Sequence, residues 1–93
     1  MEITNHVVDK MNDPTGIIEG DRYEFLLDVE VEEDDELFTE GGLELRLILA
    51  LDDNNERIVQ YHFADKVSRD VLDFEMEDDE VAEVIAYCKN ALA

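Results

Sequence analysis

The stretches that decide the fold are RYEFLLDVEV, residues 22–31, and LELRLILAL, residues 43–51. Every odd-numbered residue of both stretches is apolar, and in the second stretch every one of them is a leucine. Side chains of a strand point alternately to the two faces of a sheet, so a period of two predicts strands with one apolar face. We therefore expect two long strands, joined by an acidic loop over residues 32–42.

Three further segments have strand character, and the chain ends in a different pattern. We expect strands over residues 3–9, 57–63 and 71–76. The apolar residues near the C-terminus then follow the spacing of a single helical stripe, which predicts a helix over residues 78–91. This stripe consists of Val81, Val84, Ile85, Cys88 and Leu92. The expected fold class is α+β, an antiparallel β-meander of about five strands with one C-terminal helix packed across a sheet face.

Two connections carry turn signals. Residues 13–16, Asp-Pro-Thr-Gly, suit a type I turn. The loop near Asp52 joins strand 43–51 to strand 57–63, and side-chain parity constrains its length. An odd loop, 53–55 or 52–56, would place the next apolar residues on the leucine face. The expected pairs are Val59 with Leu49, Tyr61 with Leu47 and Phe63 with Leu45.

Composition limits the class of protein. The 93 residues include 7 Lys and Arg against 27 Asp and Glu, a formal net charge of −20. Such a chain has no basic patch for direct nucleic-acid binding or for an anionic membrane. Leu, Ile, Val and Phe make up 29 of the 93 residues, well above the roughly 20% typical of disordered chains. We expect one small, folded, acidic domain over residues 1–93.

The sequence also favours a compartment. Residues 1–7 lack the basic and apolar regions of a signal peptide. The longest apolar run, residues 47–51, is too short to span a bilayer. The single cysteine, Cys88, cannot form an intrachain disulfide. These features predict a cytoplasmic protein.

The second face of the predicted sheet is a candidate partner surface. Its expected apolar centre is Leu26, Ile48, Ala50 and Ile58, bordered by charged side chains. An apolar patch with a charged rim is typical of a homodimer interface or of a docking surface for another protein. The alternative is that the N-terminal segment, for instance Ile17 and Ile18, covers this patch.

The acidic loop contains a second candidate. Leu37 and Phe38 stand among carboxylates and could anchor the protein in a basic-rimmed apolar pocket of a partner. The alternative is that the pair folds back and caps the end of the core. The leading hypothesis is therefore a non-enzymatic binding or regulatory module with an unidentified protein partner.

A different hypothesis starts from the charge. Glu24, Asp28 and Glu30 alternate along one strand and would form a rigid row of negative charge. Such a row could occupy the nucleic-acid cleft of another protein, as a mimic of DNA or RNA. The competing interpretation is a solvated acidic surface that serves solubility or adaptation to salt.

Catalytic and metal-binding patterns are weak. Cys88 with His6 or His62 could form a nucleophile and its base. However, Cys88 lies on the apolar stripe of the helix, and the acidic residues around it would raise the pKa of its thiol. The acidic runs 32–36 and 52–56 lack the spacing of a calcium loop, so weak divalent-cation binding is a remote alternative. We expect no enzyme activity, no cofactor and no metal site.

Several stretches together resemble a known family. They are DPTG (13–16), GDRYEF (20–25), IVQYHF (58–63), LDFE (72–75) and YCK (87–89). The chain is similar to small acidic proteins of Bacillus-type Gram-positive bacteria that form a family of unknown function. The resemblance implies a bacterial cytoplasmic setting. It brings no activity, cofactor or site residue.

Overall fold

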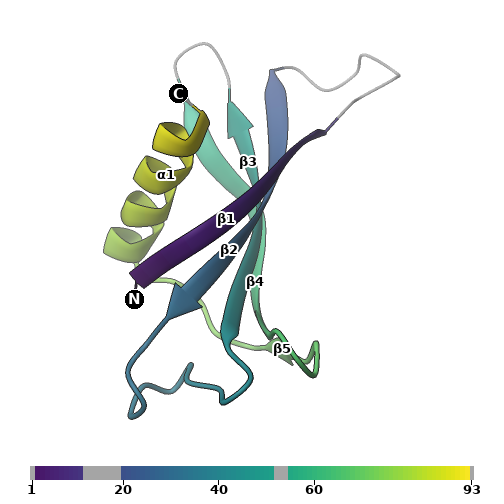
Figure 1. Ribbon diagram of the computed structural model, residues 1–93. Coiled ribbons are helices and arrows are strands. Elements are labelled where there is room, and N and C mark those ends of the chain that lie inside the picture. The colour runs from purple at the N-terminus through teal and green to yellow at the C-terminus, as the bar shows by residue number, and fades with distance from the viewer. Residues whose placement is uncertain (1, 12–19, 52–54, 93) are drawn as a thin grey trace.

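The structure is a computed structural model that describes residues 2–11, 20–51 and 55–92. The described residues form five strands followed by one helix, and Figure 1 shows how these elements are arranged. The elements are β1 (Glu2–Met11), β2 (Asp21–Glu30), β3 (Leu43–Leu51), β4 (Glu56–Asp65), β5 (Val71–Leu72) and α1 (Asp78–Leu92). The turn predicted over residues 13–16 and the proposed cover, Ile17 and Ile18, lie outside the described residues.

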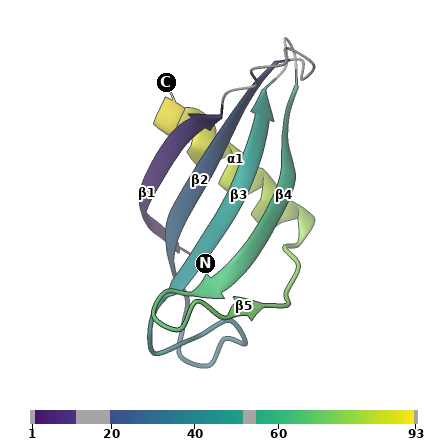
Figure 2. The same cartoon turned by 90° about the vertical axis from the view of Figure 1, so that its right-hand side faces the viewer.

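The five strands form one antiparallel sheet in the order β1-β2-β3-β4-β5. Each strand therefore pairs with its neighbour in sequence, which is a meander, and α1 runs obliquely across the back of this sheet (Figure 2). The predicted α+β fold class is confirmed.

The core lies between the sheet and α1. It contains the odd-numbered side chains of β2 and β3, as the period of two predicts, together with Phe63 of β4. Val84 and Cys88 of α1 are fully buried against them. The buried cluster consists of Phe25, Leu27, Val29, Leu43, Leu45, Leu47, Leu49, Phe63, Val84 and Cys88.

The helix begins where its charge pattern favours it. Asp78, Asp79 and Glu80 occupy the first turn and Lys89 the last, so both ends carry the charge that the helix dipole favours. The carboxylate of Glu80 also accepts a hydrogen bond from the backbone N–H of Glu77 at 3.0 Å. This is the reach-back contact of a capping box.

The last strand is much shorter than the segment 71–76 suggested by sequence. β5 has two residues, which pair with Phe63 and Ala64 of β4. The N–H of Phe74 then donates to the carbonyl of Leu72 at 3.0 Å, which closes a tight turn. The N–H of Met76 donates to the phenol oxygen of Tyr61 at 2.8 Å. These bonds take the backbone out of the sheet and lead it towards α1.

The hairpin between β3 and β4 contains a β-bulge that the parity argument did not foresee. From Leu43 to Ile48 the pairing follows the expected register, but beyond it Leu49 pairs with Ile58 and not with Val59. Four residues separate the paired Leu51 and Glu56, so the expectation of an odd loop was wrong. The extra residue that the even loop requires is accommodated inside β4.

The bulge exchanges two side chains between the faces of the sheet. Ile58 packs against the core, and Val59 is 42% exposed. The expectation that Ile58 belongs to the second face, and Val59 to the core face, is therefore corrected.

Candidate functional site

The face of the sheet opposite α1 contains three of the four predicted patch residues. Leu26 and Ile48 are half-buried there, and Ala50 is 8% exposed. The registers β2–β3 and β3–β4 place them on the side of Arg22, Arg46 and His62. We call this side the open face, because no described helix lies on it (Figure 2).

Three ion pairs lie on the open face. One connects β2 with β3, and the other two connect these strands with the turn that follows β4. Nη2 of Arg46 donates to Oε2 of Glu24 at 2.9 Å, between β3 and β2. Nζ of Lys66 lies 2.8 Å from Oδ1 of Asp28. The third pair joins Nη1 of Arg69 to Oε2 of Glu44 at 3.5 Å. The charged border of the open face is thus built from both signs.

Lys66 and Arg69 are site residues that the sequence analysis missed. Both come from the turn after β4, and Oδ1 of Asp65 organises this turn by accepting hydrogen bonds from the N–H groups of Val67 and Ser68 at 2.8 and 2.9 Å. These bonds, that from Ser68 first, lower the pKa of the Asp65 carboxyl below its ordinary value of 3.8. The sequence shows that Lys66 and Arg69 follow β4, but it does not indicate which carboxylates they contact.

The basic residues of the chain are concentrated on this face. All seven lie among the described residues, and five occupy the open face or reach it through an ion pair. These five are Arg22, Arg46, Arg57, Lys66 and Arg69. Six described acidic residues share the face, namely Glu2, Asp9, Glu24, Asp28, Glu30 and Glu44. The remaining sequence has two basic and 21 acidic residues, so the open face is nearly balanced in an otherwise strongly acidic chain.

The predicted acidic row has a different environment from the one the sequence suggested. Glu24, Asp28 and Glu30 do lie along β2 on one face. However, Glu24 and Asp28 are each within 3 Å of a cationic nitrogen. Two of the three charges are therefore compensated locally, which weakens the row as a mimic of a phosphate backbone.

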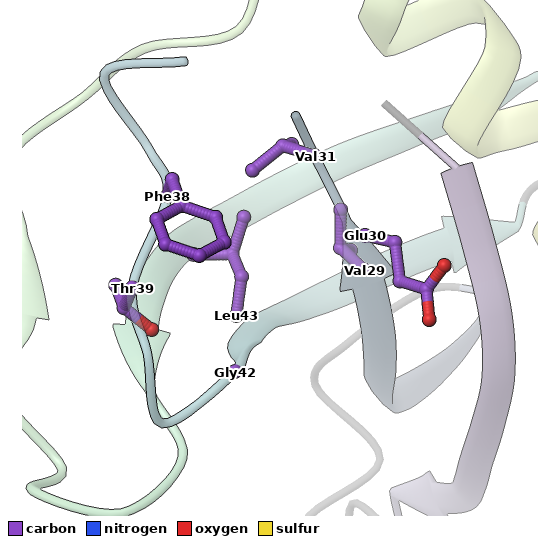
Figure 3. A pocket seen from close by; sticks show the side chains of 7 residues that line it. All are labelled: Val29, Glu30, Val31, Phe38, Thr39, Gly42 and Leu43. Atoms are coloured by element: carbon purple, nitrogen blue, oxygen red, sulfur yellow. The ribbon is translucent and has the colours of Figure 1, made fainter. Parts of the chain in front are cut away.

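The two loop candidates have different surroundings. Leu37 is half-buried and packs against the core, whereas Phe38 is 39% exposed. Figure 3 shows the Phe38 ring beside Leu43, in a pocket of about 240 Å³ that Val29 and Val31 also line. Leu37 thus has the core contact expected of the fold-back alternative, and Phe38 retains an exposed side.

Cys88 and His6, two of the groups considered for catalysis, make structural contacts. Cys88 is fully buried in the core, and this burial raises the pKa of its thiol to about 12. Nδ1 of His6 lies 2.9 Å from the phenol oxygen of Tyr87, which joins β1 to α1. In the part of the chain that the structure describes, no three His, Cys, Asp or Glu residues form a cluster that could hold a metal ion.

Within the described residues, α1 is too short and too polar to cross a bilayer.

The fold and the open face define a class of protein. It is an α+β meander in which one helix covers one face of the sheet, and the other face has an apolar centre among ion pairs. The family follows from comparison with known proteins. The model of the Family of unknown function (DUF6509) matches residues 1–93, so the chain belongs to this family. No curated protein and no solved structure matches the chain significantly.

Proposed function

We propose that this protein is a non-enzymatic binding or regulatory module of the cytoplasm, which contacts another protein through its open face. The observation that carries this proposal is the distribution of charge. Five of the seven basic residues lie on the open face with Leu26, Ile48 and Ala50 or reach it through an ion pair, in a chain with a net charge of −20.

The balanced charge favours contact between proteins. A strongly acidic surface repels most acidic partners, and its charged groups retain their bound water. Such a surface is therefore unfavourable for close contact with another protein. On the open face, the ion pairs of Glu24 and Asp28 reduce this repulsion. Apolar side chains such as Ile48 can then be buried by a partner at a smaller electrostatic cost. Arginine is also enriched at protein interfaces.

The state of the Cys88 thiol supports a role in binding and not in catalysis. A nucleophilic cysteine reacts as its thiolate, in an exposed and electropositive environment. Cys88 has no exposed surface, and burial raises its pKa to about 12. We therefore place the function on the surface of the sheet.

Affinity capture from an extract of the source cells tests the proposal. Wild-type protein is compared with Ile48→Arg, on the open face, and with Ala86→Arg, a matched change at an exposed position of α1. We expect one discrete protein to be retained above physiological salt by the wild type and by Ala86→Arg, and to be lost with Ile48→Arg. Electrostatic background is screened over about 8 Å under these conditions.

Two results would contradict the proposal. One is equal capture by all three proteins, which would place the contact elsewhere. The other is self-association in sedimentation equilibrium that Ile48→Arg abolishes, because the open face would then be the interface of a homodimer.

A further inference from the structure

The free edge of β4 is a second feature of the surface, and it adjoins the open face at Gln60 and His62. β4 has ten residues, but β5 pairs only with Phe63 and Ala64. On this side, residues 56–62 pair with no described strand. Figure 2 shows this edge beside β5 and the segment that leads to α1. An unpaired edge presents backbone N–H and C=O groups to an incoming strand.

The composition of this edge is unusual for the chain. Residues 58–64 are the longest stretch of the sequence without Asp, Glu, Lys or Arg. Free edges are commonly protected by charged side chains, and 37% of this chain is charged. Residues 58–62 of this free edge therefore have no charged side chain.

A groove runs along the same edge. It measures about 530 Å³ and lies between residues 58–62 of β4 and residues 71–75. Val59, Val71 and Phe74 line it and are 42%, 64% and 38% exposed. These are three of the seven large apolar side chains that are exposed among the described residues.

The wall of the groove is held in place by contacts with β4. The phenol oxygen of Tyr61 accepts the hydrogen bond from the N–H of Met76 at 2.8 Å. The Tyr61 ring in turn packs edge-on against Phe63, with 6.3 Å between the ring centroids. The groove therefore has one wall of strand edge and one wall of anchored backbone.

We propose that the edge of β4 binds a short extended segment of a partner protein as an added strand, with apolar and basic residues in alternation. An added strand gains main-chain hydrogen bonds from the edge and specificity from pockets for alternate side chains. The apolar residues of the segment would contact Val59 and Phe74. The charged residues that line the groove are both acidic, Asp73 and Glu75, so its other side chains would be Lys or Arg.

A second copy of this chain fits the edge less well than a basic segment. Two copies joined at this edge would bring together the acidic residues Asp73 and Glu75 of both chains. A basic segment meets the same carboxylates with the opposite charge.

The alternation of hydrogen bonds identifies the amide that should report binding. On the β5 side of β4, the N–H of Asp65 donates to the carbonyl of Asp70 at 3.0 Å. Two residues earlier in the sequence, Phe63 pairs with Leu72 of β5. Backbone groups of a strand point alternately to its two sides, so the N–H of Tyr61 is the next one directed outwards. A bound strand should slow its hydrogen exchange.

The experiment uses a fluorescently labelled peptide of alternating valine and lysine, with fluorescence anisotropy at physiological salt and amide exchange by NMR. We expect saturable binding and slower exchange at Tyr61. The same peptide with N-methylated backbone amides keeps its charge but cannot pair, and we expect it not to bind. Asp73→Asn with Glu75→Gln should weaken binding roughly three- to tenfold. The matched pair Glu32→Gln and Glu33→Gln, in the acidic loop, should leave it unchanged.

Several outcomes would overturn this proposal. Equal binding of the N-methylated peptide would reduce the effect to charge attraction. Protection of Tyr61 that rises with protein concentration, without peptide, would assign the edge to a second copy of the chain. Ile48→Arg should leave peptide binding intact, so failure of the open-face proposal and failure of this one are distinguishable.

Discussion

Leu49 of β3 pairs with Ile58 of β4, although its neighbour Ile48 pairs with Gln60. The residue between Ile58 and Gln60, Val59, is the extra residue of a bulge, and its side chain is turned outwards. This single register shift decides which of two adjacent β-branched side chains enters the core. It also moves Ile58 from the open face to the core, and Val59 from the core to the groove along the edge of β4.

The bulge leads to a prediction about stability. We expect Ile58→Ala to lower the free energy of unfolding by about 1–3 kcal/mol, because a side chain packed on the core is removed. Val59→Ala should change it by about 0.5 kcal/mol or less, since that side chain is largely in water. Urea denaturation of both variants measures the difference. A larger loss for Val59→Ala than for Ile58→Ala would mean that the strand follows the unshifted register.

The ion pairs of the open face predict opposite effects for two neutralised carboxylates. Glu24→Gln removes the partner of Arg46 and should lower the stability by about 0.2–1 kcal/mol at low salt. Glu33→Gln, in the exposed acidic loop, should raise the stability slightly, because it relieves repulsion in a chain of charge −20. Thermal unfolding at low and at high salt tests this. The difference between the two variants should disappear at about 1 M salt, where the Debye length is only about 3 Å and charges interact over a shorter range.

Asp65 predicts a pH-dependent difference. Its pKa in the folded protein is lowered below 3.8 by the hydrogen bonds from Ser68 and Val67. The stabilisation that it provides is therefore present above the unfolded value and is lost as the pH falls through the folded value. Asp65→Asn should lower the melting temperature at neutral pH, and its difference from the wild type should shrink below about pH 4. Asp70→Asn, in the same turn, is the control for the loss of one negative charge.

The acidic loop predicts separate effects for its two apolar residues. Leu37→Ala should lower the free energy of unfolding by about 1–2 kcal/mol, because Leu37 packs against the core. Phe38→Ala should cost about 1 kcal/mol or less, as part of its ring is exposed. Denaturation measures both values. If Phe38→Ala also abolished capture of the partner with little loss of stability, Phe38 would be an anchor for binding.

The buried thiol predicts slow chemistry. A thiol reagent should modify Cys88 very slowly in the native protein and rapidly once denaturant unfolds it, since the side chain has no exposed surface and burial raises its pKa to about 12. The absorbance of the released reagent group follows the reaction. Rapid modification under native conditions would show that α1 detaches from the sheet at low cost.

Sequence alone was sufficient for the architecture. The period of two in residues 22–31 and 43–51 and the helical stripe after Val81 each specify one apolar surface. Burying these surfaces together requires a sheet with a helix on one face. The bounds of β3 and the start of α1 were predicted to the residue, because local patterning determines them.

The tertiary structure decided what the sequence left open. The length of β5 depends on hydrogen bonds to Leu72 and to Tyr61, which local pattern does not encode. The position of Ile58 depends on a bulge that absorbs one residue of the hairpin. The balance of charge on the open face arises because Lys66 and Arg69, distant in sequence from β2 and β3, reach Asp28 and Glu44. Net charge is a property of composition, but its arrangement on a surface is fixed only when the strands and turns pack together.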